Sequence, residues 1–501
     1  MRKIGTSPRG CILGDSRMKK LIVDTKYGRI EGLHGWDPRI AVFKGVPYAK
    51  PPIGELRFRS PQPLEGWNGV LQAFDYAPVA MQETPGIHKD SFWTKEMHPT
   101  GPEYEVSEDC LYLNIFTPAR DDRAMLPVLF YIHGGGFSGG YPSEIEFDWE
   151  HMAKKGMVVV SIQYRLGIFG FLASSALSGI HQEEGKGNYG IEDQIAALRW
   201  TKENIRSFGG DPDRITIAGQ SAGAMSVQCL LASPLTEGLI SGAIVESCIE
   251  GDFPELPVFA NTLAASEAIG NEFMEKGGYK TLEDLQAADA QVLLDQVDAL
   301  LGPGFHFRPT IDGKVLTESP FAAYLHDHHK RVPMLVGYNR GETLVFADVE
   351  DTHTAEMKED ADLGIIVATR MFGYIQDSQD RTTYLYEFDG DIPGPDKIGS
   401  YHGSEMWFAY DALARCDRPF TGRHYDLARQ MSSYWASFIK NGDPNGKDTA
   451  GYDLPGWESF TRENDFLMLF SDRPVKSPGI TDARMKQIIA EKTGTAQRSV
   501  L

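Results

Sequence analysis

The chain is long, acidic and moderately apolar: it has 501 residues, of which 42% are hydrophobic, and a formal charge of -21. A chain of this composition can bury a large core, which excludes the disordered and fibrous classes. Its negative charge would repel nucleic acid and anionic membrane surfaces, so we expect neither as a partner.

The cysteines and the first residues indicate a reducing compartment. The chain has five scattered cysteines, Cys11, Cys110, Cys229, Cys248 and Cys416. An odd number without metal-ligand spacing argues against a full disulfide framework and against a zinc site. The first 20 residues lack the apolar core of a signal peptide, and no later run approaches the roughly 18 apolar residues of a membrane span. We therefore expect a cytoplasmic protein with a disordered extension at 1–17 and a single domain at 18–501.

Short β-rich stretches come first in the chain. They are LIVDTKYGRIEGL at 21–33 and IAVFKGVPYA at 40–49, and a proline-rich loop follows at 51–63. This pattern predicts a small antiparallel region at the entry to a larger domain.

Apolar runs then alternate with a helical pattern. The expected strands are VLFYI at 128–132, MVVVSI at 157–162, RITIAG at 214–219, GAIVES at 242–247 and MLVGYN at 334–339, and a helix is expected over 191–209. This alternation predicts an α/β fold, a large mostly parallel sheet with helices on both faces. MVVVSI and RITIAG have apolar residues on both faces of the pleated strand, as expected for central strands that are covered on both sides. Residues 251–300 are helical and acidic in pattern and are expected outside the sheet.

The stretch AGQSAGAMS at 218–226 places Ser221 where a buried strand turns directly into a helix. Such a corner is sharp and strained, and glycines at Gly219 and Gly223 let the chain pass without a collision of side chains. The N–H of Ala222 begins the helix and can stabilise an oxyanion. A pattern this short also occurs by chance in a tight turn, so further signals are needed.

A run of glycines supplies the second signal. Gly134, Gly135 and Gly136 follow His133 at the end of an apolar strand, and consecutive glycines expose their N–H groups. A phosphate-binding loop requires Gly-Lys-Ser/Thr after its glycines, whereas FSGGYP follows here. An oxyanion hole is therefore the better interpretation.

Several stretches together carry a resemblance to a known family. FGGDPDRITIAGQSAG and SEDCLYLN are joined by FKGVPYAKPPIGELRF, YIHGGGF, NYGIEDQIAALRW and FIKNGDPNG, in this family's order, between about residues 20 and 475. These stretches resemble the type-B carboxylesterases, which include cholinesterases and bacterial para-nitrobenzyl esterases. The resemblance implies an α/β-hydrolase fold and a catalytic triad in the chain order serine, acid, histidine.

The resemblance also implies the residues of that triad. It places the nucleophile at Ser221, the acid at Glu342 in LVGYNRGETLVF and the base at His402 in YHGSEMWFAYDAL. Glu342 departs from the family pattern, because Gly341 and Thr343 flank it where relatives have an acid and a glycine. A solvated loop carboxylate is the alternative for Glu342.

The mechanism follows from this assignment. The histidine removes the serine proton, the oxyanion is held by the N–H groups of Gly135, Gly136 and Ala222, and an acyl-serine forms and is hydrolysed. No metal or organic cofactor is required. Ser247 resembles a serine that supports the acid, although Cys248 stands where the family has a glycine.

Two departures bear on the substrate. Gln220 stands before the nucleophile where the family often has glutamate, and the loss of that charge disfavours cationic choline esters. The interval from acid to base, 402 minus 342, is 60 residues, which is short for the family. We expect a trimmed lid and an open pocket that accepts bulky or aryl esters.

Three further patterns have structural interpretations. Cys110 lacks a cysteine in APVAMQ, where secreted relatives place its disulfide partner, so a buried free thiol is expected. Glu108 is expected to pair with Arg57. His326, His328 and His329 are expected to mark the surface end of a helix rather than a metal site, because no supporting ligands recur near them.

The sequence therefore predicts a serine hydrolase that cleaves small-molecule carboxylic esters through an acyl-enzyme, as a monomer or homodimer. An amidase or carbamate hydrolase would use the same residues. A non-catalytic binding protein on the same fold is the alternative from another class.

Overall fold

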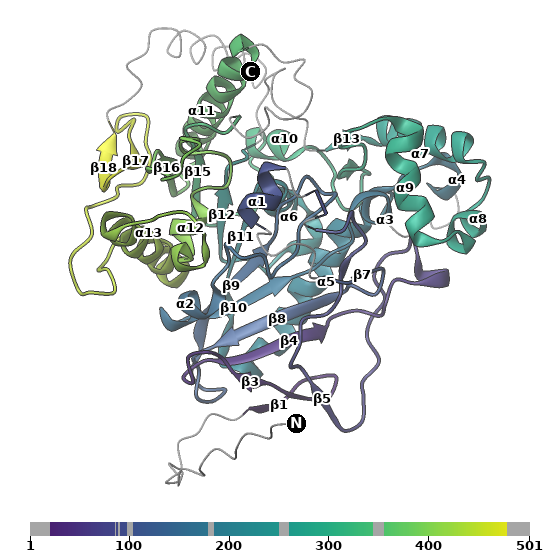
Figure 1. Cartoon of the computed structure of the whole chain (residues 1–501), viewed down its shortest axis with the longest axis horizontal. Coiled ribbons are helices and arrows are strands. Elements are labelled where there is room, and N and C mark those ends of the chain that lie inside the picture. The colour runs from purple at the N-terminus through teal and green to yellow at the C-terminus, as the bar shows by residue number, and fades with distance from the viewer. Residues whose placement is uncertain are drawn as a thin grey trace, which may run out of the picture.

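A computed structural model describes residues 21–85, 87–88, 91–97, 104–178, 185–249, 260–343 and 355–477. Its main feature is an eleven-stranded sheet (Figure 1). From one edge to the other the strands are β18 (Pro474–Ser477), β17 (Leu467–Phe470), β16 (Thr383–Phe388), β15 (Met334–Asn339), β12 (Gly242–Glu246), β11 (Gly210–Gln220), β9 (Leu126–Ile132), β10 (Val158–Ile162), β8 (Tyr112–Thr117), β4 (Ala41–Pro47) and β3 (Leu33–His34). Every pairing from β17 to β10 is parallel, and antiparallel strands lie at both edges.

Helices cover both faces of this sheet, which confirms the α/β-hydrolase fold class. On β9, Phe130 and Ile132 belong to one buried cluster, whereas Leu129 and Tyr131 belong to another. Successive side chains of a strand point to opposite faces of the sheet, and both faces are buried here, so the strand is apolar along its whole length. The first cluster includes α5 (Tyr189–Asn204) and α6 (Ala222–Ala232), and the second includes α2 (Trp149–Lys154) and α13 (Gly422–Asn441).

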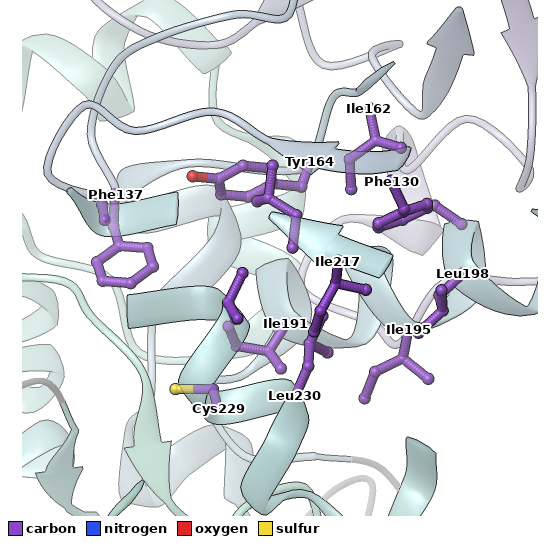
Figure 2. Close-up of a cluster of buried hydrophobic side chains, with 14 of the residues drawn as sticks. Phe130, Phe137, Ile162, Tyr164, Ile191, Ile195, Leu198, Ile217, Cys229 and Leu230 are labelled. Carbon is purple, nitrogen blue, oxygen red and sulfur yellow. The ribbon is translucent and has the colours of Figure 1, made fainter. Parts of the chain in front are cut away.

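Figure 2 shows how the first cluster is filled. Ile217 of β11 lies above Ile191 and Ile195 of α5 and Leu230 of α6, and Phe130 of the neighbouring β9 lies between Ile217 and Ile162 of β10. Burial of aliphatic side chains of this kind contributes about 1.5–3 kcal/mol each to the free energy of unfolding. The helix that follows the serine corner is therefore fixed against the centre of the sheet.

The helices predicted for residues 251–300 are present in the described part of that segment. They are α7 (Leu263–Gly277), α8 (Leu282–Ala287) and α9 (Ala290–Leu301), and they lie together away from the large sheet in Figure 1. The remaining elements are η1 (Gly54–Leu56), β6 (Val79–Ala80), α1 (Phe92–Met97), β7 (Val106–Ser107), α3 (Gly167–Phe171), α4 (Ser175–Ser178), η2 (Ile205–Phe208), η3 (Pro234–Thr236), β13 (Asn261–Thr262), β14 (Thr310–Ile311), α10 (Pro320–Leu325), α11 (Ala355–Ser378), α12 (Met406–Ala409) and η5 (Leu413–Arg415).

The N-terminal β region differs in detail from the prediction. A small sheet of β1 (Ile22–Asp24), β2 (Arg29–Glu31) and β5 (Val70–Gln72) is present, but β2 pairs with β5 in parallel. The second expected strand, β4, instead joins the large sheet beside β8. Its apolar residues are buried in both clusters, and a local sequence pattern does not specify which sheet a strand joins. The expected extension at 1–17 lies outside the described residues, and the single domain at 18–501 stays a prediction.

The predicted ion pair of Arg57 and Glu108 is confirmed. Arg57 Nη2 lies 2.5 Å from Glu108 Oε2, and the same guanidinium donates to the carbonyl oxygens of Leu285 and Ala288. Arg57 therefore fastens the end of α8 to the N-terminal part of the chain. Cys110 beside this pair is a buried free thiol, as predicted, and burial raises its pKa well above the ordinary value.

Candidate active site

Ser221 occupies the predicted corner between β11 and α6. Its backbone has φ 56° and ψ -125°, a conformation that costs a non-glycine residue about 1–3 kcal/mol. The corner is held by backbone hydrogen bonds: the N–H of Ser221 donates to the carbonyl of Glu246 at 3.0 Å, and its carbonyl accepts from Met225 at 2.9 Å. Strain fixed in this way lifts the serine side chain off the end of the sheet, where it stays partly exposed.

The two glycines of the motif are required by close backbone contact. A Cβ on Gly219 would lie 2.5 Å from the backbone of Gly223, and a Cβ on Gly223 would lie 2.1 Å from the carbonyl oxygen of Ile132. Neither distance is possible for a real side chain. The spacing of the motif is therefore a packing requirement of the strand–corner–helix geometry, as the sequence predicted.

The glycine loop after β9 lies directly beside the serine. A Cβ on Gly134 would come within 3.2 Å of Ser221 Cβ, and both Gly135 (φ 98°) and Gly136 (φ 61°) adopt left-handed backbone conformations. Within the described residues, the N–H groups of Gly135 and Gly136 donate to no backbone or side-chain acceptor. Two free donors next to a strained serine suit an incoming oxyanion.

His133 anchors the start of this loop. Its ring stacks on Tyr164 with centroids 4.6 Å apart, and the Tyr164 hydroxyl donates to the His133 carbonyl at 3.0 Å. Burial lowers the pKa of His133 to about 4, so the ring is neutral at pH 7. It is therefore a support for the loop and not a second base.

Two loops bring Glu342 and His402 together across 60 residues of chain. The N–H of Gly341 donates to the Ser400 carbonyl at 3.1 Å, and Gly341 forms an isolated parallel bridge with Tyr401. Glu342 Oε2 then accepts a short hydrogen bond from His402 Nδ1, and Glu342 Oε1 accepts from the N–H of Asn339 at 2.7 Å. Both carboxylate oxygens are thereby fixed in a buried position.

The charge of Glu342 controls the imidazole. Burial opposes a charged histidine, but the attraction and hydrogen bond of Glu342 outweigh it and raise the pKa of His402 above the ordinary value. With its Nδ1 proton directed to Glu342, the neutral ring presents a lone pair at Nε2. Nε2 lies 3.2 Å from the side-chain nitrogen of Gln220, which can donate to it. Gln220 directly precedes Ser221, so the imidazole lies close to the serine corner.

Comparison with known proteins decides the family. The model of the carboxylesterase family matches residues 19–380 and 362–490. The para-nitrobenzyl esterase of Bacillus subtilis is 31% identical over 94% of this chain and 99% of its own, and the fumonisin B1 esterase of Sphingopyxis macrogoltabida is 32% identical over 92% and 88%. The crystal structure of a Geobacillus stearothermophilus carboxylesterase superposes with a TM-score of 0.78 at 32% identity, covering 93% of this chain and 99% of that one.

The chain belongs to the carboxylesterase family. It is a carboxylic ester hydrolase, and its substrates are small-molecule esters. This finding sets aside the non-catalytic binding protein as an interpretation of the fold. No helix in the described ranges is both long and apolar enough to cross a membrane.

The geometry of this carboxylesterase corrects the expectation for Ser247. Its hydroxyl donates at 2.5 Å to Glu405 Oε1, and not to Glu342. Asn339 Nδ2 donates to the Ser247 oxygen at 2.9 Å and makes a short hydrogen bond to Glu405 Oε2. Ser247 therefore supports a second buried carboxyl, because the strand ends of β12 and β15 direct it towards α12 and not towards the loop of Glu342.

Glu405 was not among the residues expected from the sequence. It follows His402 by three residues in the same loop, and this spacing is the signal that could have pointed to it. Burial, followed by repulsion from Glu342, raises the pKa of Glu405 to about 7. Glu405 is therefore partly protonated at neutral pH, whereas Glu342 makes the direct hydrogen bond to the imidazole.

Proposed function

We propose that this carboxylesterase works through a triad of Ser221, His402 and Glu342. The contact between Glu342 and His402, placed beside the strained serine corner, is the observation that supports this assignment most strongly. Glu342 fixes the tautomer with the proton on Nδ1, in which Nε2 can accept a proton. His402 exchanges its contact with Gln220 for one with the serine hydroxyl when an ester is bound, since catalytic hydrogen bonds of free enzymes often form only in the complex.

The chemical steps balance as an acyl transfer. Ser221 Oγ attacks the ester carbonyl as its proton moves to His402 Nε2, and the N–H groups of Gly135, Gly136 and Ala222 hold the oxyanion. The tetrahedral species expels the alcohol, which takes the proton from His402, and acyl-Ser221 remains. Water then repeats the sequence, releases the acid and restores the serine. Each oxyanion donor is expected to contribute about 3 kcal/mol of transition-state stabilisation.

Aromatic side chains flank this site on two sides and favour bulky or aryl neutral esters. Phe305 is 58% exposed, yet a Cβ on Gly136 would lie 2.3 Å from its ring, so the ring packs against the bare Cα of that glycine. Trp93 meets His402 edge to face with centroids 6.5 Å apart. His402 protonates the leaving alcohol, so Trp93 lies on the alcohol side and Phe305 on the side of the oxyanion. Gln220, which contacts His402, adds no charge to the site.

A pair of isosteric substrates tests this preference. Acetylcholine and 3,3-dimethylbutyl acetate have the same shape, and we expect kcat/KM to be at least about 10-fold higher for the neutral ester, because an unpaired cation is costly to desolvate. Gln220→Glu should narrow that ratio by supplying a carboxylate. Phe305→Ala and Trp93→Ala should each lower kcat/KM several-fold for phenyl acetate and less for methyl acetate. Preference for choline, or reaction with short acyl esters alone, would contradict the proposal.

The pH profile tests the role of the imidazole. His402 must be neutral to accept the serine proton, and its pKa is raised by Glu342, so kcat/KM should rise with pH to a plateau through a midpoint above the ordinary histidine value of about 6.5. In Glu342→Gln the residual activity should have its midpoint at lower pH, because the charge that favours the imidazolium is gone. The measurement is kcat/KM for a neutral ester between pH 5 and 9. A midpoint that stays in place in this variant would contradict the account.

Location and assembly stay proposals. We infer a cytoplasmic enzyme because the four cysteines within the described ranges, Cys110, Cys229, Cys248 and Cys416, form no disulfide bond, as in a reducing compartment. A monomer or homodimer stays the prediction for its assembly. The expected trimming of the lid concerns the interval from Glu342 to His402, of which residues 344–354 lie outside the described part of the chain, and it stays a prediction.

A further inference from the structure

Three potential metal ligands meet around helix α10. Glu318 lies before the helix, and its Oε2 and Oε1 lie 2.7 Å from His326 Nδ1 and 2.6 Å from His328 Nδ1. One donor atom of each residue lies within 4.8 Å of the other two. The sequence-based expectation of a bare helix end assumed that these histidines have no supporting ligand. The structure corrects that assumption, because one short helix brings Glu318 back to them.

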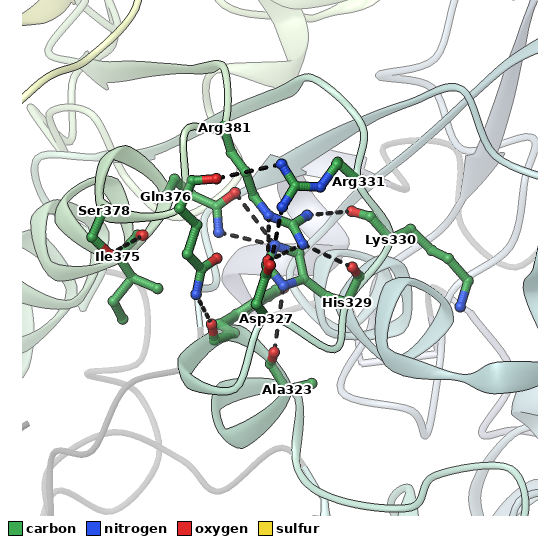
Figure 3. Close-up of polar contacts among 11 residues, drawn as sticks. Ala323, Asp327, His329, Lys330, Arg331, Ile375, Gln376, Ser378 and Arg381 are labelled. Carbon is green, nitrogen blue, oxygen red and sulfur yellow. Dashed lines mark hydrogen bonds and ion pairs between the residues drawn. The ribbon is translucent and has the colours of Figure 1, made fainter. Parts of the chain in front are cut away.

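The residues that follow each of the two histidines in sequence, Asp327 and His329, are fixed by hydrogen bonds and ion pairs (Figure 3). Asp327 accepts from Arg381 Nε at 2.8 Å and from Arg331 Nη2 at 3.0 Å. His329 is buried and donates or accepts at Gln376, 3.0–3.3 Å away.

Arg381 also fixes the backbone that follows Asp327. It donates to the carbonyl oxygens of His329 at 3.2 Å and Lys330 at 2.9 Å (Figure 3). The backbone of 327–330 is thereby fixed from its inner side. His326 precedes the anchored Asp327, and His328 lies between Asp327 and His329. Both imidazoles contact Glu318 in this fixed backbone, so less conformational entropy is lost when a ligand is bound.

We propose that Glu318, His326 and His328 form a binding site for a divalent transition-metal ion, of which zinc is the representative. Two neutral imidazoles and a carboxylate are a donor set that suits zinc, nickel or copper, and not the all-oxygen preference of magnesium or calcium. Zinc binds nitrogen and oxygen at about 2.0–2.2 Å, which places tetrahedral ligands roughly 3.3 Å apart. Glu318 therefore needs to move by less than an ångström from each imidazole to admit the ion.

The exposure of the ligands fits an ion that enters from solvent. The side chains of His326 and His328 are 54% and 64% exposed, and Glu318 is 22% exposed. Water can therefore occupy the fourth position. The two cations that follow the histidines in sequence are both paired: Lys330 Nζ lies 3.3 Å from Glu237 Oε2, and Arg331 Nη2 lies 3.0 Å from Asp327 Oδ2.

This site is separate from the ester chemistry. The N–H of Lys330 donates to the carbonyl of Leu231 at 2.9 Å, so the cluster lies by the C-terminal end of α6, whose N-terminal end carries Ser221. Eleven helical residues span about 16 Å. A metal here would join the loop before α10 to the loop after it, and it would stabilise the fold without entering the reaction.

Zinc titration of the tag-free, chelator-treated protein tests the proposal. Calorimetry should find one zinc ion per chain in the tightest class of sites, and Tm should rise with zinc concentration. Glu318→Gln and the double variant His326→Ala/His328→Ala should weaken zinc binding by more than about 10-fold and lose the Tm shift. All variants should keep wild-type hydrolysis of a p-nitrophenyl ester in metal-free buffer, which shows that they are folded.

His88→Ala is the matched control. His88 is an exposed histidine that pairs with Glu83 at 2.7 Å, and among the described residues this pair belongs to no three-ligand cluster. This variant should bind zinc as the wild type does. The proposal is wrong if the wild type binds no zinc, if Glu318→Gln and the double histidine variant bind it as tightly as the wild type, or if His88→Ala loses it to the same extent. In those cases the cluster is a hydrogen-bonded pair of surface histidines only.

Discussion

Replacing Ser221 with alanine should lower kcat/KM for a p-nitrophenyl ester by roughly a million-fold, to a small residue above the uncatalysed rate. The reason is that Ser221 supplies the attacking oxygen beside the glycine loop and the imidazole. Stability should hardly change, because alanine meets the same backbone strain at φ 56° that serine does. Ser221→Gly should be equally inactive but more stable, since glycine adopts this conformation freely.

Ser226→Ala is the control for this experiment. Ser226 is a buried serine on the same helix and accepts from Gln194 Nε2 at 2.9 Å. Its loss should lower the free energy of unfolding by about 1 kcal/mol and leave kcat/KM within a few-fold of the wild type. If Ser221→Ala kept wild-type activity while Ser226→Ala lost it, the nucleophile would have been misassigned.

Glu342→Gln should lower kcat by about 10⁴-fold. The carboxamide is close in shape to the carboxylate, but its NH₂ group cannot accept from His402 Nδ1, and it favours the tautomer with the proton on Nε2. The base is then protonated at the position where it has to receive the serine proton. The measurement is steady-state kcat and KM at the plateau of the pH profile, with KM expected to change little.

Glu405→Gln tests whether the second buried carboxyl near the site acts as the triad acid in place of Glu342. Glu405 faces Ser247 and Asn339 and already has a pKa of about 7, so it is partly neutral under the conditions of the assay. We expect its replacement by glutamine to change kcat by less than about 10-fold, because a neutral side chain of the same shape keeps part of the hydrogen-bond network. A larger loss in Glu405→Gln than in Glu342→Gln would make Glu405 the triad acid instead.

The parts of the site that are local in sequence could be predicted from sequence. The motif from Gly219 to Gly223 lies within five residues between a strand and a helix, although its glycines also pack against the backbone of Ile132 on β9. The central strands could be predicted because burial on both faces leaves a continuous apolar run. In both cases the sequence signal lies within a short stretch of chain.

The parts that depend on distant strand ends could not be predicted in detail. Ser247, Asn339 and Glu405 meet because β12 and β15 are neighbours and a later loop folds over their ends. The resemblance gave Ser247 a role beside the acid, but it could not show which of two carboxyls the hydroxyl reaches. Gln220 likewise appeared only as a missing charge, whereas the structure places its amide on the nitrogen of His402.

The same limit applies outside the active site. β4 looked like part of a separate entry region because its pattern says nothing of its partner strand, and it pairs with β8 of the main sheet. Glu318 was overlooked as a neighbour of the two histidines because a helix, and not a fixed spacing, returns the chain to it.

Covalent labelling tests the central assignment most directly. Diethyl p-nitrophenyl phosphate transfers its phosphoryl group to an activated serine and releases one p-nitrophenolate, which can be counted, and peptide mass spectrometry then locates the modified residue. The account predicts one equivalent of p-nitrophenolate per chain, with the phosphoryl group on Ser221 and labelling strongly slowed in Glu342→Gln. A label on another residue, or equal labelling of Ser221→Ala, would contradict it.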